Sequence, residues 1–323
     1  MRYLTDARVS GREDRPARRL ADPAAATWRR GEFPARFLNR RLVGRILTYG
    51  VLSLGSVLFL APYVEMVLTS FMGPHQFRDA QMTTWRVTRT LQNELWPDPW
   101  TTQGYMAVWE AAPVLSWIVN SLILVVLGLF GQTFVSILVA FGFARTQLPG
   151  RNFLFIVVLA TLMLPYQMFM GPWYAIFREI GRLGSLWSVA LPDLWGNAFY
   201  IFIFRQFFLT IPVELDEAAE IDGANLLQVL FRVVVPLSTP AIATVAVFNI
   251  VAKWNQFFWP LVFIQWPERL PVAVGIRWFR TQHGYDPQLL MVTCIISMAP
   301  VVMFFLIAQR YFLRGAVLAG VRP

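Results

Sequence analysis

Long runs of apolar residues dominate the chain, and the short stretches between them hold most of its polar residues. Several of these runs reach or pass 18 residues, the length at which an apolar segment indicates a transmembrane helix. The expected spans cover about residues 46–68, 117–143, 153–177, 186–208, 241–264 and 289–308. We therefore predict an all-α protein, a polytopic membrane helix bundle with six transmembrane helices.

Prolines interrupt two of the predicted spans. Pro165 and Pro172 lie inside the third, where two missing N–H groups predict a kink or a break. Pro192, Gly196 and Asn197 lie near the start of the fourth. Of the connecting segments, 69–115 and 265–288 are predicted to be external.

Composition excludes several classes of protein. The chain is 56% hydrophobic and only 15% charged, which is not typical of a soluble enzyme. The net charge is +9, but 12 of the 28 basic residues precede residue 46. Basic residues beside a span mark the cytoplasmic side, so this charge indicates topology and no nucleic acid partner. Residues 1–45 are predicted to be a disordered, arginine-rich cytoplasmic tail, followed by a transmembrane domain over 46–323.

The residues that usually carry chemistry are scarce. Cys294 is the only cysteine, Lys253 is the only lysine, and the two histidines are far apart in the sequence. No disulfide can form within the chain, and no cysteine and histidine cluster offers a metal site. The Gly-Lys-Ser/Thr signature of a phosphate-binding loop is absent. If ATP drives this protein, another chain must hydrolyse it.

The loop 209–240 carries a dense group of acidic residues. They are Glu214, Asp216, Glu217, Glu220 and Asp222. We expect a short helix from about Pro212 to Asp222, because proline suits a first helical turn and early acidic side chains favour the positive end of the helix dipole. Thr210 is the expected cap, and Gly223 offers a break. A second helical piece, 224–235, is expected to end against Pro236.

The fifth span has a polar face. Asn249, Lys253 and Gln256 recur at positions i, i+4 and i+7, so they lie on one side of a helix. A lysine in the middle of a span costs roughly 2.5–3.5 kcal/mol on insertion scales, so Lys253 should face the bundle interior or a wet cavity. No carboxylate lies near it in the sequence. Together with Asn255, this face forms either a wall of a translocation path or a set of hydrogen bonds between helices.

The acidic loop also carries a resemblance to a known family. Its residues Glu217, Ala218, Ala219, Gly223, Val233 and Pro236 resemble the loop signature of membrane subunits of binding-protein-dependent ABC importers. Further matches are Arg205-Gln206-Phe207-Phe208, Ile221-Asp222-Gly223-Ala224, Trp254-Asn255 and Gln309-Arg310-Tyr311-Phe312. The resemblance covers roughly residues 45–315. It is to the carbohydrate branch, where the chain is similar to the maltose-permease G-type subunit.

The resemblance implies a type I importer permease in the cytoplasmic (inner) membrane, with both termini cytoplasmic. Loop 209–240 would be the coupling loop that fits a groove of an ATPase. In it, Glu217 would be the anchoring charge, Ala218 and Ala219 would give clearance, and Gly223 would supply a turn. The other coupling residues would be Glu214, Glu220, Asp222 and Pro236. The family often has a small polar residue at the position of Lys253, so a shared role for this lysine does not follow.

The same resemblance implies the partners. They are a second permease subunit, two copies of a cytoplasmic ATPase, an extracytoplasmic solute-binding protein and a sugar or related polyol as substrate. The chain itself would be no enzyme and would hold no cofactor, because the ATPase would bind ATP and magnesium. Two alternatives stay open: a solitary secondary carrier or channel, and an intramembrane lipid-linked transferase. The first would show inverted repeats, and the second would need convergent ionisable groups in the membrane.

Overall fold

The computed structural model describes residues 35–73, 76, 96–281 and 286–320. Every regular element in these ranges is a helix, which confirms the predicted all-α class. Residues 1–34 of the predicted tail lie outside the described residues. The tail was expected to extend to residue 45, and α1 (Ala35–Ser70) begins at Ala35, within that range.

The chain divides into two units, residues 1–60 and 61–323, with the boundary inside α1. Helix α1 contains a candidate span, Leu42–Ser70, with Pro62 inside it. Large apolar side chains along this helix, such as Leu47, Leu54 and Phe59, are exposed. Such a surface is suited to lipid, as the sequence predicts for the first span.

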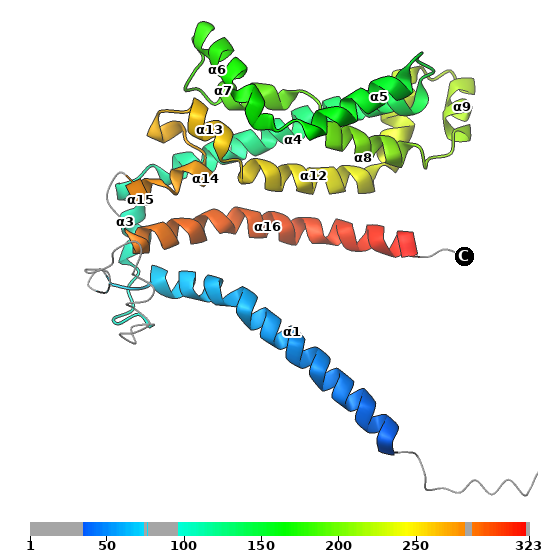
Figure 1. Cartoon of the computed structure of the whole chain (residues 1–323). Coiled ribbons are helices and arrows are strands. Elements are labelled where there is room, and N and C mark those ends of the chain that lie inside the picture. The colour runs from blue at the N-terminus through cyan, green and yellow to red at the C-terminus, as the bar shows by residue number, and fades with distance from the viewer. Residues whose placement is uncertain (1–34, 74–75, 77–95, 282–285, 321–323) are drawn as a thin grey trace, which may run out of the picture. The chain divides into compact units, whose positions relative to one another are not determined.

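Helix α4 (Val114–Arg145) is the centre of the second unit. Helices α8 (Ala198–Phe208) and α12 (Thr239–Trp254) pack along it, and α16 (Pro287–Gly320) packs against α12 (Figure 1). Buried apolar side chains join these helices, among them Ala140 of α4, Phe204 of α8 and Val245 of α12. The small residue on α4 lets the larger side chains of its neighbours approach closely.

The third predicted span is bent, as its prolines indicated. It consists of α5 (Arg151–Ala160), η3 (Thr161–Met163), η4 (Tyr166–Phe169) and α6 (Met170–Glu179). Its two halves meet at an angle of 90° around Pro165.

The fourth predicted span, 186–208, is broken in the part that holds Pro192 and Asn197. Helix α7 (Trp187–Ala190) continues into η5 (Leu191–Leu194), and α8 begins only at Ala198. The physical cause is local. Pro192 lacks a backbone N–H, and the side chain of Asn197 caps the new helix by accepting from the N–H groups of Phe199 (2.9 Å) and Tyr200 (3.4 Å).

The fifth predicted span is also divided, because α12 ends at Trp254 and α13 (Phe258–Phe263) begins after three intervening residues. Among the described residues, three helices are long and apolar enough to cross a membrane, or up to five if each bent pair counts as one span. The predicted number of six is not reached by this measure, since the fourth span is too fragmented to be counted.

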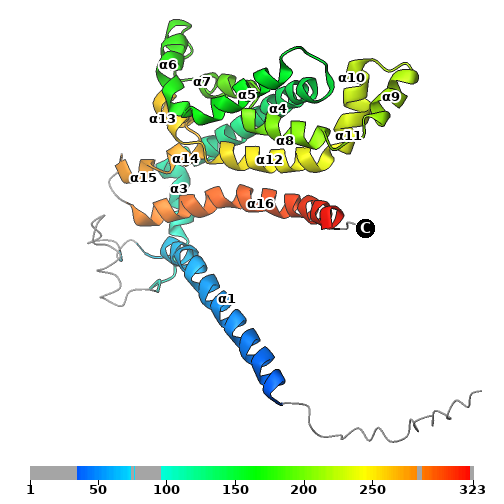
Figure 2. The ribbon, with the colours of Figure 1, turned by 45° about the vertical axis from the view of Figure 1, so that its right-hand side comes forward.

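The connecting elements of the second unit gather at its two ends (Figures 1 and 2). At one end lie α9 (Glu214–Ile221), α10 (Leu226–Val229), the π-helical turn η6 (Leu230–Val234) and α11 (Val235–Leu237). At the other end lie α3 (Gln103–Ala111), η7 (Pro267–Arg269), α14 (Val272–Gly275) and α15 (Trp278–Thr281). The predicted loops 209–240 and 265–288 are therefore at opposite ends of this unit.

Candidate functional site

Helix α9 is the short helix predicted in the acidic loop, and it begins at Glu214. Its first turn holds Glu214, Asp216 and Glu217, whose negative charges favour the positive end of the helix dipole. The predicted cap is wrong. Val213 occupies the cap position without a side-chain hydrogen bond, and the hydroxyl of Thr210 instead donates to the carbonyl of Phe207 at 2.7 Å.

The end of α9 is a glycine turn, as predicted. Gly223 has φ of +85°, a conformation that residues with a Cβ resist. Its N–H donates to the carbonyl of Glu220 at 2.9 Å, and the N–H of Ala224 donates to the carbonyl of Ala219 at 2.9 Å. These bonds satisfy carbonyl groups at the helix end.

The second helical piece differs from the prediction at both ends. It begins at Leu226, because Asn225 forms a capping box with Gln228. It does not end against Pro236, which lies at the start of α11, where a missing N–H is tolerated. The chain instead turns after Leu237, and the segments Leu226–Leu237 and Thr239–Phe263 meet at 79°.

A buried ion pair fastens α9 to α4. Asp216 is 7% exposed, and its Oδ2 lies 2.8 Å from the Nε of Arg145, the last residue of α4. A second nitrogen of Arg145 donates to the carbonyl of Ile211 at 2.8 Å. One arginine therefore holds both the approach to α9 and its first turn. The predicted coupling residues did not include Asp216, and no spacing in the sequence points to a partner on another helix.

Burial dominates the electrostatics of this pair. It raises the pKa of the Asp216 carboxyl above its usual value, an effect that Arg145 opposes and Glu220 adds to. The charged form of Asp216 is thus less favoured here than in water, even beside a guanidinium.

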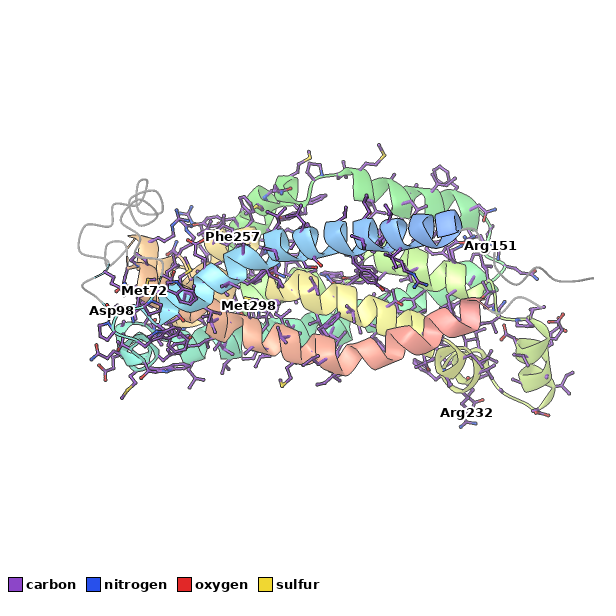
Figure 3. All side chains as sticks on the ribbon, turned by 90° about the horizontal axis from the view of Figure 1, so that it is seen from below. Met72, Asp98, Arg151, Arg232, Phe257 and Met298 are labelled. Carbon is purple, nitrogen blue, oxygen red and sulfur yellow. The ribbon has the colours of Figure 1, made fainter. Side chains whose placement is uncertain are left out.

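The opposite face of α9 is exposed and acidic. Glu214, Glu217 and Glu220 are exposed, as is Ala218, while Ala219 is half-buried against the apolar core. The two alanines therefore face differently: Ala218 keeps the outer face small, and Ala219 lets α9 lie close to its neighbours. Figure 3 shows the labelled Arg232 at this same end of the second unit.

A second polar group lies deep in the bundle, around Lys253 of α12. The lysine is 9% exposed, and its Nζ lies 2.6 Å from Oδ1 of Asp193 in η5. The amide of Gln132 on α4 donates to the same carboxylate oxygen at 3.3 Å. The buried Asn249 in turn donates to Gln132 at 2.8 Å. Sequence analysis found no carboxylate for Lys253, because Asp193 comes from a different span.

These residues border a cavity of about 560 Å³, named here the polar cavity. Its polar lining includes Gln132, Asp193, Lys253, Asn255 and Gln256. Of the four residues predicted for a translocation path, Lys253, Asn255 and Gln256 thus share one cavity. The fourth, Asn249, is not in its lining and is fully buried in hydrogen bonds between helices. The described residues contain no group of three His, Cys, Asp or Glu that could hold a metal ion.

Three proteins similar to this chain are permeases of transport systems. The chain is 30% identical over 227 residues to the probable ABC transporter permease protein YurM of Bacillus subtilis, covering 70% of this chain and 75% of that protein. It is 31% identical over 287 residues to the sn-glycerol-3-phosphate transport system permease protein UgpE of Yersinia pestis, covering 86% and 98%. It is 29% identical over 261 residues to the arabinooligosaccharides transport system permease protein AraQ of Halalkalibacterium halodurans, covering 81% and 90%.

Two solved structures share the fold. One is a bacterial ABC transporter involved in the import of the acidic polysaccharide alginate, with a TM-score of 0.71, 21% identity and coverage of 85% of this chain and 98% of that one. The other is the alginate transporter in complex with a pentasaccharide-bound periplasmic protein, with a TM-score of 0.57, 13% identity and coverage of 84% and 95%. Residues 133–317 match the family described as the binding-protein-dependent transport system inner membrane component, and the chain belongs to that family.

Proposed function

We propose that this permease imports a sugar or related polyol and is driven through α9 by a separate ATPase. In this proposal the ATPase binds ATP and magnesium, two copies of it serve the complex, and a second permease subunit completes the pathway. A solute-binding protein docks at the end that carries α3, α14 and α15. The end with α9 and both chain termini face the cytoplasm, since the ATPase is there.

One observation supports coupling through α9 above the others: its exposed face is acidic, and its buried face is attached to α4 by an ion pair. Its exposed face offers Glu214, Glu217 and Glu220 to a partner, and its buried face is tied to the end of α4 by the pair of Asp216 and Arg145. Helix α4 is continuous from this arginine to Gln132, which borders the polar cavity. A displacement of α9 would therefore be passed by one rigid helix to the cavity wall.

The substrate class is supported by the names of relatives. Arabinooligosaccharides, which one of those names mentions, are rich in hydroxyl groups, and sn-glycerol 3-phosphate, which another mentions, is the phosphate ester of a polyol. The polar cavity combines amide and carboxylate groups with aromatic side chains, a lining suited to such solutes.

The coupling role is tested by Glu217→Ala in the complete complex with its ATPase and binding protein. We expect substrate-stimulated ATP hydrolysis to be abolished, because truncating one partner of a desolvated charge pair costs about 2–5 kcal/mol. Insertion and folding of the permease should not change, since Glu217 is exposed in this chain. A matched control is Glu179→Ala, which removes an exposed carboxylate at the end of α6 and should keep full stimulation. Full stimulated hydrolysis in the Glu217→Ala complex would show that the coupling role is wrong.

A further inference from the structure

The polar cavity has walls of fixed aromatic rings. Trp259 is held on two sides: its indole N–H donates to the carbonyl of Ser188 at 3.2 Å, and its ring stacks on Phe263 at 5.0 Å between centroids. The ring of Tyr166 lies 6.5 Å from that of Trp259, and Trp173 stacks on Phe177 at 5.7 Å. Tyr166, Trp173 and Trp259 all line the cavity. Flat apolar surfaces held in place are suited to the apolar faces of a sugar ring.

Lys253 is the one cationic residue among the described residues that line this cavity, and it already has a counter-charge. Lys253 contacts Asp193 at 2.6 Å, and both side chains are about nine-tenths buried, with 10% and 14% of their surface exposed. The pair carries no net charge, so an anionic ligand would meet the repulsion of Asp193 together with the attraction of Lys253 and would gain little from the lysine.

The unsatisfied polar atoms of the lining are hydrogen-bond acceptors. The second carboxylate oxygen of Asp193, Oδ2, is buried and has no hydrogen-bond partner in the described structure. The same is true of Oε1 of Gln256 on the same cavity. A buried acceptor without a partner costs free energy that a hydrogen-bond donor recovers, so these two oxygens favour a ligand that carries donors. A hydroxyl group supplies one, and a phosphate or carboxylate does not.

We infer that the polar cavity of this subunit binds a neutral, hydroxyl-rich solute and discriminates against anionic ones. Hydroxyl groups of the solute donate to Asp193 and Gln256 after these side chains turn their buried oxygens toward the cavity, and its apolar face packs on the rings of Trp173 and Trp259. The inference rests on the proposed function for the sugar or polyol class. It adds that this chain itself contacts the solute and that the solute carries no negative charge.

Direct binding to the purified complex tests this inference in the absence of nucleotide and binding protein. The probes are neutral disaccharides (maltose, sucrose and arabinobiose) and anionic solutes (digalacturonate and glycerol 3-phosphate), followed by saturation-transfer NMR. We expect at least one neutral disaccharide to bind, with saturation transferred to its ring protons, and the anionic solutes to bind more weakly. Tighter binding of either anionic solute, or no binding of any neutral disaccharide, would overturn the inference.

Variants assign the binding to this chain. Gln256→Leu removes one acceptor and leaves the ion pair intact, and it should weaken binding of the neutral disaccharide about tenfold, the usual effect of one lost hydrogen bond. The double variant Asp193→Asn/Lys253→Gln removes both charges together, so no unpaired charge is left to unfold the bundle, and it should weaken binding at least as much. The control Glu179→Gln alters an exposed carboxylate outside the cavity and should bind like the parent.

Two outcomes keep this inference separate from the coupling role. Binding that is unchanged in both cavity variants would place the solute on the partner permease and overturn the inference, whatever Glu217→Ala does. Binding that is weakened as expected, together with full stimulated hydrolysis in Glu217→Ala, would refute coupling through α9 and leave the cavity assignment standing.

Discussion

At the scale of single residues, two opposing effects act on the charge of Asp216 in loop 209–240: its burial and its contact with Arg145. Burial of Asp216 disfavours its charge, and Arg145 at 2.8 Å restores part of what burial costs. The pKa of Asp216 remains above the usual value, so burial outweighs the attraction. The contribution of this carboxyl to folding is therefore largest when it is protonated.

The pH dependence of this site follows from the sign of that shift. A carboxyl whose pKa is raised by folding adds stability that is fully present below its unfolded pKa and is lost as pH rises through the folded pKa. Asp216→Asn imitates the protonated carboxyl and keeps a group that can accept from Arg145. We expect α9 of the variant to match the parent at acidic pH and to be more protected at neutral pH.

Hydrogen exchange measures this difference at the amides of Asp216 and Glu217, which donate to the carbonyl of Val213 at 2.9 and 3.1 Å. Each measured rate is divided by the intrinsic rate for its own sequence at that pH, so the protection factors of parent and variant are compared. Weaker protection of the variant at neutral pH would mean that the attraction of Arg145 outweighs the cost of burial.

At the scale of elements, broken helices shape the polar cavity. The fourth span is interrupted at η5, which carries Asp193, before it continues as α8. The short η5 segment packs directly on α4. Gly131 makes the contact possible, because a Cβ at this position would lie 2.6 Å from the Leu194 side chain and 3.0 Å from its Cα. The position of Asp193 beside Lys253 thus depends on a glycine on a third element.

Gly131→Ala should push η5 away from α4 and destabilise the bundle by about 1–3 kcal/mol, the typical cost of overpacking. The matched control is Gly142→Ala on the same helix, where a new Cβ meets nothing within 4 Å. It should be neutral or stabilise by about 0.5–1 kcal/mol, because alanine is the better helix former. Thermal unfolding of the purified complex compares them, and equal stability of the two variants would show that this contact is not tight.

At the scale of the whole molecule, one ion pair joins segments that are distant in the sequence. Asp193 of η5 and Lys253 of α12 meet at 2.6 Å, and Gln132 brings α4 to the same carboxylate. Burying either charge alone inside the helix bundle would cost several kcal/mol, and pairing the two charges offsets much of that cost. The pair therefore selects one arrangement of the spans around the polar cavity.

A double-mutant cycle measures how strongly the two charges depend on each other. Lys253→Met should destabilise the complex by about 3–5 kcal/mol, because it leaves Asp193 buried without compensation. Asp193→Asn should be harmful for the same reason, and the double variant should recover most of the loss. Thermal unfolding of the assembled complex is the readout. Additive effects of the two substitutions would show that the charges do not interact.

The family membership was within reach of the sequence because its signature is local. Glu217-Ala218-Ala219 and Gly223 stand close together in one loop, and the structure forms the expected short helix and glycine turn there. Membership also removes the two alternatives, a solitary carrier and a lipid-linked transferase. The number of continuous spans was harder to predict from the sequence. The fourth segment is apolar and long enough to span, but Pro192 lacks a backbone N–H and Asn197 caps a new helix, so the segment is broken.

The sequence by itself determined the all-α membrane class, the kink at Pro165, the acidic helix and the polar face of α12. All of these follow from the period of the helix, from runs of apolar residues or from backbone rules that act over a few positions. Only the tertiary structure decided that Asp216 meets Arg145 and that Asp193 meets Lys253. The physical reason is that each pair joins different helices, and the packing of whole helices, which no local pattern encodes, brings such charges together.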